Sequence, residues 1–182
     1  MRGFLSFLLF FGALVADFTL AHLLLPGSLV SQYPVRLRFA LTLLTVYAFA
    51  RGAERGAAVG AVLGLATDMA FGRAIGPNLY FDAVWGLLAG EARRIVYRNI
   101  WTAALLSGLA ALLNDAFLYG LFRLFRWTEV EPEYWFRHQA MWDALLGAAL
   151  CLLLYPLGSV FRDSDAEATE AADGEQEGAH ER

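Results

Sequence analysis

The chain has 182 residues, of which 58% are hydrophobic and 18% are charged. A soluble domain averages about 45–50% apolar and about 25% charged residues, so the composition excludes an ordinary soluble domain and indicates an integral membrane protein. The net charge of −4 is uneven, because residues 162–182 carry eight acidic residues and two arginines, whereas the rest of the chain carries 12 arginines and ten acidic residues. The sequence has no basic stripe with interleaved aromatic residues, which disfavours nucleic-acid binding.

Six apolar runs follow one another within residues 1–161. A hydrocarbon core of about 30 Å needs about 20 helical residues, and the runs therefore predict an all-α bundle of about six transmembrane helices, near residues 4–25, 37–50, 56–76, 78–90, 100–122 and 138–161. The second and fourth runs are short, which leaves open a tilted, re-entrant or protein-enclosed segment. The first run contains Asp17 and no convincing cleavage site, so we interpret it as an uncleaved anchor.

The distribution of charged residues predicts the orientation of the chain in the membrane and the nature of its C-terminal segment. The densest arginine cluster in a connection, Arg93, Arg94 and Arg98, favours a cytoplasmic position and places both termini in the cytoplasm. Residues 162–182 are acidic and free of aromatic residues, which predicts a disordered cytoplasmic tail. Cys151 is the single cysteine; it excludes an intramolecular disulfide and predicts an inert packing residue.

Small residues recur at every fourth position through the third run. This glycine ladder consists of Gly52, Gly56, Gly60, Gly64, Asp68, Gly72 and Gly76. Residues four apart lie on nearly the same helix face, and small residues there let helices approach closely in lipid. We therefore expect the third run at the centre of the bundle. We also expect a groove for a packing or partner helix along Gly56, Gly60, Gly64, Gly72 and Gly76.

Five aspartates interrupt the apolar runs: Asp17, Asp68, Asp82, Asp115 and Asp143. Ionisable residues inside spans cost about 2.5–3.5 kcal/mol on insertion scales and usually face protein or water. Counted along each run, all five fall in its outer half. They are therefore expected to line one outward-facing polar cavity, or to pair with Arg73 and Arg36 at its mouth. Such a cluster is either a recognition site for a ligand or partner, or a polar network that holds the bundle together.

The connection between the fifth and sixth runs holds residue types that are enriched at binding hot spots. Its candidate partner-contact residues are Trp127, Tyr134, Trp135 and Arg137, and the alternative interpretation is an aromatic membrane belt. The sequence shows no catalytic triad, zinc-binding or phosphate-binding motif. We therefore predict no enzymatic activity, no cofactor and no metal site.

The stretch from Gly60 to Gly76, with Gly64-Leu65 followed by Asp68 and then Gly72, resembles the rod shape-determining MreD proteins. Asn114 and Asp115 in the penultimate run agree with the same family layout. The resemblance implies a non-enzymatic subunit of the bacterial cell-elongation complex in the inner membrane. It also implies association with a single-span MreC-like protein and, through it, with the actin-like MreB filament, a RodA-type glycosyltransferase and a class B penicillin-binding protein.

Two functions remain open from the sequence. In the first, the chain is a scaffold whose glycine ladder and outer rim dock a single-span partner. In the second, suggested by the similarity of the family fold to the S-components of energy-coupling-factor transporters, Asp68, Asp115 and Asp143 contact a cationic or polyhydroxylated solute. The aromatic connection favours the scaffold, and the Phe-rich start of the first run disfavours docking of a transport partner there.

Overall fold

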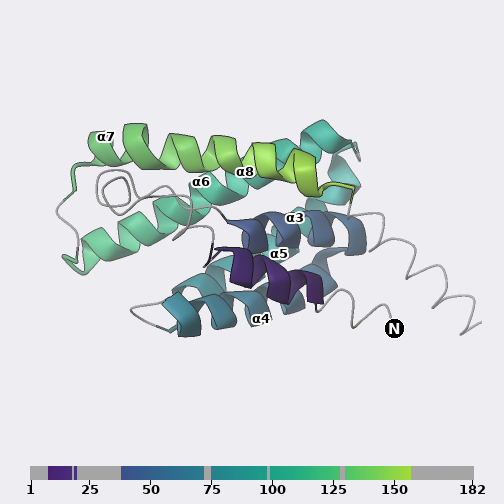
Figure 1. The fold of residues 1–182 in the computed structure, drawn as a ribbon, viewed down its shortest axis with the longest axis horizontal. Coiled ribbons are helices and arrows are strands. Elements are labelled where there is room, and N and C mark those ends of the chain that lie inside the picture. The colour runs from purple at the N-terminus through teal and green to yellow at the C-terminus, as the bar shows by residue number, and fades with distance from the viewer. Residues whose placement is uncertain are drawn as a thin grey trace, which may run out of the picture.

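The computed structural model describes residues 8–17, 19, 38–71, 75–97, 99–127 and 130–156, and every secondary-structure element in this part of the chain is a helix (Figure 1). Its elements are a helix at Leu8–Asp17 and then α3 (Phe39–Arg51), α4 (Ala53–Phe71), α5 (Pro77–Ile95), α6 (Ile100–Leu124), α7 (Pro132–Trp135), the π-helical turn η1 (Phe136–Ala140) and α8 (Met141–Leu154). The junction residues between α7, η1 and α8 keep right-handed helical backbone angles, so the three form one continuous helix. The all-α prediction is thus confirmed for the described residues, and the predicted tail lies outside them.

The helices begin and end where the local sequence directs. Gly52 ends α3 with a positive φ of 103°, a conformation that L side chains rarely adopt. Gly76, with a φ of 126°, and Pro77 begin α5, since proline is favoured in the first helical turn. The side chain of Asn99 caps α6 by accepting a 2.7 Å hydrogen bond from the Ile100 amide.

Helix α3 is the centre of the bundle, and the expectation that the third run would hold this position was wrong. Nine of the 13 residues of α3 are buried, and the helix contacts α4, α5, α6 and α8. Its apolar residues join two clusters. One includes Leu43, Leu44 and Trp85, and the other includes Val46 and Cys151. The reason is composition: α3 is apolar around most of its circumference, whereas glycines give α4 close contact along one face.

Helices α4 and α5 form an antiparallel pair with backbone-to-backbone contact. A Cβ built on Gly60 would lie 2.1 Å from the carbonyl oxygen of Asp82, and one built on Gly56 would lie 2.5 Å from that of Gly86. The contact is equally close from the α5 side, because a Cβ built on Gly86 would lie 2.2 Å from the Gly56 carbonyl oxygen. These distances exclude any side chain, so both helices need glycine along this contact.

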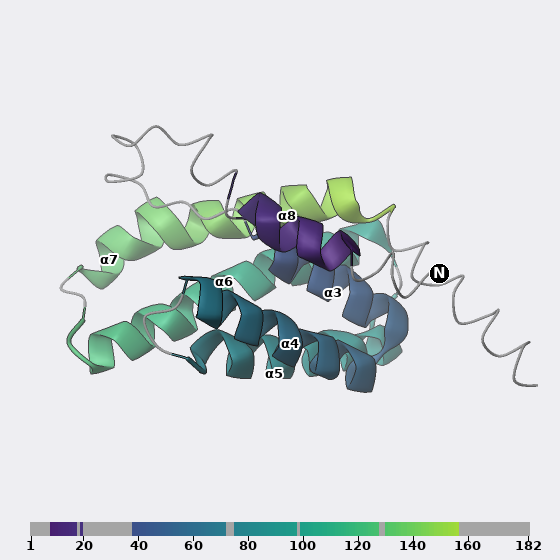
Figure 2. The ribbon, with the colours of Figure 1, turned by 60° about the horizontal axis from the view of Figure 1, so that its bottom comes forward.

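Helices α6 and α8 form the second close pair, with Gly108 and Gly147 against each other's helix. Figures 1 and 2 show α6 and α7 reaching past α4 and α5 at the end where α6 turns back. At 1.5 Å per residue, α6 is about 37 Å long and α4 about 28 Å. Among the described helices, α6 alone is both long and apolar enough to cross a membrane unaided. Crossing by all six predicted runs, and the direction of each, stay predictions.

Candidate functional site

Two of the predicted aspartates cap the start of another helix. Asp68, at the end of α4, accepts hydrogen bonds from the Gly76, Asn78 and Leu79 amides and from the Asn78 side chain, at 2.8–3.2 Å. Asp17 in the same way accepts hydrogen bonds from the Phe39 and Ala40 amides at the start of α3. A carboxylate at a helix N-terminus satisfies amides that have no partner within the helix and complements the helix dipole.

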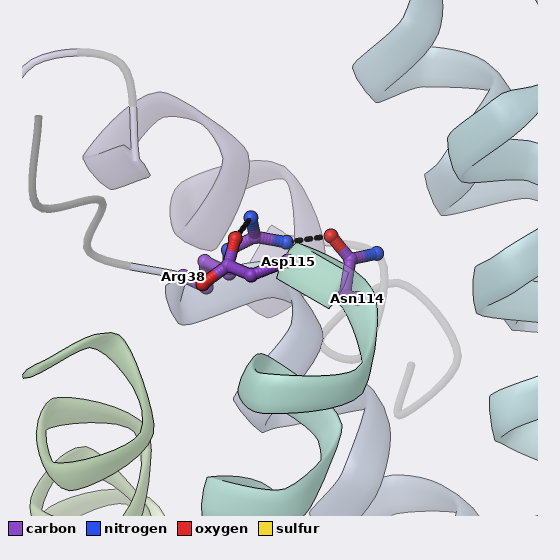
Figure 3. Close-up of polar contacts among 3 residues, drawn as sticks. All are labelled: Arg38, Asn114 and Asp115. Carbon is purple, nitrogen blue, oxygen red and sulfur yellow. Dashed lines mark hydrogen bonds and ion pairs between the residues drawn. The ribbon is translucent and has the colours of Figure 1, made fainter. Parts of the chain in front are cut away.

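Arg38 lies at the centre of the polar contacts. Its guanidinium donates hydrogen bonds to the Asn114 side chain and to Asp115, with which it forms an ion pair (Figure 3). Figure 3 shows Arg38 arriving from the start of α3 and both partners from α6. The pair therefore joins the central helix to the longest helix, and the side chains of Arg38 and Asp115 are 14% and 2% exposed.

Asp82 lies on α5 at a buried position with 7% exposure. It is within electrostatic range of Arg38, Asp17 and Asp68, and it has no hydrogen bond with another of the described residues. Asp143, on α8, is 1% exposed. We call Arg38 and the aspartates around it, Asp17, Asp68, Asp82 and Asp115, the polar cluster. Within the described part of the chain, Arg38 Nε and Asp115 Oδ2 have no hydrogen-bond partner.

Four of the five aspartates that were expected to line an outward-facing cavity are buried. Asp68, Asp82, Asp115 and Asp143 are at most 7% exposed, so in this structure they lie inside the protein instead of lining a surface open to water. In the described part of the chain, the cation paired with Asp115 is Arg38, a residue that the sequence analysis did not single out. Arg73 and Arg36, expected at the mouth of the cavity, lie outside the described residues.

The glycine ladder divides into several roles. Gly56, Gly60 and Gly64 lie against α5 of the same chain, so the groove expected to receive a helix is filled from within. Gly52 and Gly76 lie outside α4 and end or begin neighbouring helices, while Gly72 lies outside the described residues. The sequence reading missed the α5 side of this contact, although Gly86 and Gly90 carry the same spacing of four.

Three of the four predicted partner-contact residues are aromatic and lie with Tyr119 where α6 connects to α7. We define this aromatic end as Tyr119, Trp127, Tyr134 and Trp135. Tyr119 stacks on Trp135 at 4.5 Å between ring centroids, and its hydroxyl donates a 2.7 Å hydrogen bond to the Val130 carbonyl. Trp127 and Tyr134 are 47% and 49% exposed. These contacts hold the connection against α6 and leave Trp127 and Tyr134 about half exposed.

This connection was expected to be a loop, which was wrong for the part from Pro132 onward. Tyr134 and Trp135 belong to α7, and Arg137 belongs to η1. Pro132 explains the change, because proline starts a helix well in its first turn. The Arg137 guanidinium then forms a 2.9 Å ion pair with Glu133, one helical turn earlier.

The family comparison is decisive for the chain as a whole. The sequence model of the rod shape-determining protein MreD family matches residues 1–162. The chain belongs to the MreD family. Membership makes this MreD-family chain a cell-shape-related membrane protein and confirms the resemblance found at Gly60–Gly76. No curated protein and no solved structure matches the chain.

The buried polar side chains of this MreD-family chain are mostly engaged in contacts between helices. In the described residues, no group of three or more His, Cys, Asp or Glu side chains could hold a metal ion. The oxygens of Asp68 and Asp17 accept hydrogen bonds from helix amides, and Asp115 Oδ1 is paired with Arg38. Each of these three contacts links two different helices, which stabilises their relative positions.

Proposed function

We propose that this chain is a non-enzymatic scaffold subunit of the bacterial cell-elongation complex in the inner membrane. In this role it binds a single-span MreC-like partner and thereby supports cell shape and peptidoglycan synthesis. A RodA-type glycosyltransferase and a class B penicillin-binding protein are further proposed members of the assembly. The observation that carries the proposal is the aromatic end, where exposed rings are held by the chain's own contacts.

A pre-ordered aromatic surface is suited to protein binding. Tyr and Trp are enriched at interface hot spots, and rings already fixed in place lose little entropy on binding. Trp127 contacts Phe122 and Phe125 at 5.8 and 5.4 Å between centroids, so its ring is supported from α6. The end reaches beyond α4 and α5 (Figure 2), where a partner's helix and its extramembrane base can both contact it.

The glycine groove contributes to this proposal indirectly. Because α5 fills the groove of α4, we assign partner contact to the aromatic end and helix packing to the glycines. The alternative solute-binding function requires Asp68, Asp115 and Asp143 to contact a ligand. The Asp68 carboxylate already accepts four hydrogen bonds from the start of α5, and one oxygen of Asp115 is paired with Arg38. This engagement favours the scaffold over the solute-binding subunit.

Co-purification from native membranes tests the proposal. The double variant Trp127→Ala, Tyr134→Ala should reduce recovery of the single-span partner at least tenfold, since hot-spot side chains contribute about 2 kcal/mol or more. The matched control is Trp101→Ala, because Trp101 is 70% exposed but lies at the opposite end of α6. Equal recovery by both variants would refute the assignment of the surface. Recovery of an ATPase pair in place of a single-span protein would support the transport function.

A further inference from the structure

We propose that the turn between α3 and α4, together with the end of α5, forms a binding surface for the headgroups of anionic phospholipids. We call it the arginine surface and define it by Arg51, Arg55, Arg93 and Arg94. It lies at the opposite end of α5 from Asp82 and the aspartate caps. It is therefore separate from the polar cluster and from the aromatic end.

The arginine surface is assembled by close packing of α5 on the turn. A Cβ on Gly90 would lie 2.3 Å from the Ala53 amide nitrogen, so the last turns of α5 touch the start of α4. Arg93 folds over the turn, with its guanidinium carbon 3.1 Å from the Cβ position of Gly52, and donates a 3.3 Å hydrogen bond to the Ala50 carbonyl. Charges from three helices thus meet at one end of the bundle.

The charge balance at the arginine surface is positive. The described residues there include four arginines and two glutamates, Glu54 and Glu91, which leaves an excess of two positive charges. Glu91 forms a 3.3 Å ion pair with Arg94, but the Arg94 side chain keeps 71% of its surface exposed. Arg55 is also exposed, so positive groups face outward even where they have partners in the chain.

The surroundings favour a lipid over a protein as the occupant. Tyr97 and Trp101, which follow α5 and begin α6, are 93% and 70% exposed. Exposed Tyr and Trp at helix ends mark the level of the headgroups in a membrane. Arginines at that level attract anionic lipids by about 1 kcal/mol each, and their planar guanidinium groups match phosphate oxygens.

Phospholipid binding to the purified full-length chain tests the proposal. We expect native mass spectrometry in neutral detergent to show a preference for phosphatidylglycerol over phosphatidylcholine of roughly 25-fold, from two excess charges at about fivefold each. The double variant Arg55→Gln, Arg94→Gln should abolish that preference. Because both side chains are exposed, the variant should retain its helical circular dichroism and its elution volume.

Two further variants separate charge from other effects. Arg55→Lys, Arg94→Lys keeps the charges and should keep the preference within about a factor of three. Arg137→Gln removes an arginine whose side chain is also 71% exposed, but from the opposite end, and should leave the preference unchanged. Undiminished preference in the Gln double variant would overturn the proposal. Equal binding of the two lipids by the unaltered chain, with an acidic peptide bound instead, would also overturn it and assign the surface to a protein partner.

Discussion

The cap formed by Asp68 allows a quantitative prediction about stability. Asp68 is 2% exposed, and each of its two carboxylate oxygens accepts two hydrogen bonds from the start of α5. Hydrogen bonds to a charged group contribute about 1.5–3 kcal/mol each, and unpaired buried amides cost about 1–3 kcal/mol. Because the four bonds share one carboxylate, they are not additive, and we expect Asp68→Ala to lower the free energy of unfolding by about 3–4 kcal/mol.

Asp68→Asn should have an intermediate effect. One asparagine oxygen still accepts hydrogen bonds, but the other position becomes an NH₂ group that faces two donors. We therefore expect a loss of about 2 kcal/mol. Thr67→Ala is the matched control, since the Thr67 hydroxyl bonds the Leu63 carbonyl of its own helix at 2.9 Å and its removal should cost less than about 0.5 kcal/mol.

Unfolding by SDS in mixed micelles, followed by tryptophan fluorescence, provides the measurement. Trp85 is a suitable reporter, because it is 4% exposed and its indole N–H donates a 2.9 Å hydrogen bond to Thr45 on α3. Its environment changes when α5 leaves α3. If Asp68→Ala proves as stable as Thr67→Ala, Asp68 does not stabilise α5 and the reasoning is refuted.

Three more perturbations test the rest of the bundle by the same unfolding assay. Gly60→Ala forces a Cβ to within 2.1 Å of a backbone oxygen and should lower the free energy of unfolding by about 2–3 kcal/mol. Gly12→Ala is the control, because its Cβ would meet no atom within 4 Å; equal stability of the two variants would contradict the close pairing of α4 and α5. Asp115→Leu should cost about 3–5 kcal/mol by leaving Arg38 buried without its counter-ion, and adding Arg38→Met should recover most of this loss; an additive double variant would contradict the ion pair. Removal of residues 163–182 should change stability by less than about 0.5 kcal/mol, and a larger loss would contradict the predicted tail.

Much of the helical layout was predictable because it depends on local chemistry. The run predicted near residues 100–122 corresponds to α6 at Ile100–Leu124, and the one near 37–50 corresponds to α3 at Phe39–Arg51. Gly76 and Pro77 begin α5, and Asn99 caps α6. These effects involve only the backbone and the first helical turn, so they can be located in the sequence. The family motif is similarly local, since Gly64 and Asp68 lie within five residues of each other.

The polar cluster was predictable only in part. That five aspartates would avoid lipid follows from the cost of a charge in hydrocarbon, and Asp68 does lie buried beside polar neighbours. Their partners did not follow, because Asp115 and Arg38 are far apart in the chain and meet only when α6 packs on α3. A spacing of four in one helix likewise does not reveal which helix fills the groove.

The sequence by itself determined that this chain is a helical membrane protein of the MreD family, because apolar content, helix-ending residues and a short motif are all properties of neighbouring residues. Only the tertiary structure decided that α3 is the centre, that α5 fills the glycine groove and that Arg38 neutralises Asp115. The physical reason is that lipid offers little hydrophobic drive for helix association. Partners are therefore selected by close shape and by polar groups from distant parts of the chain, and these come together only in the folded protein.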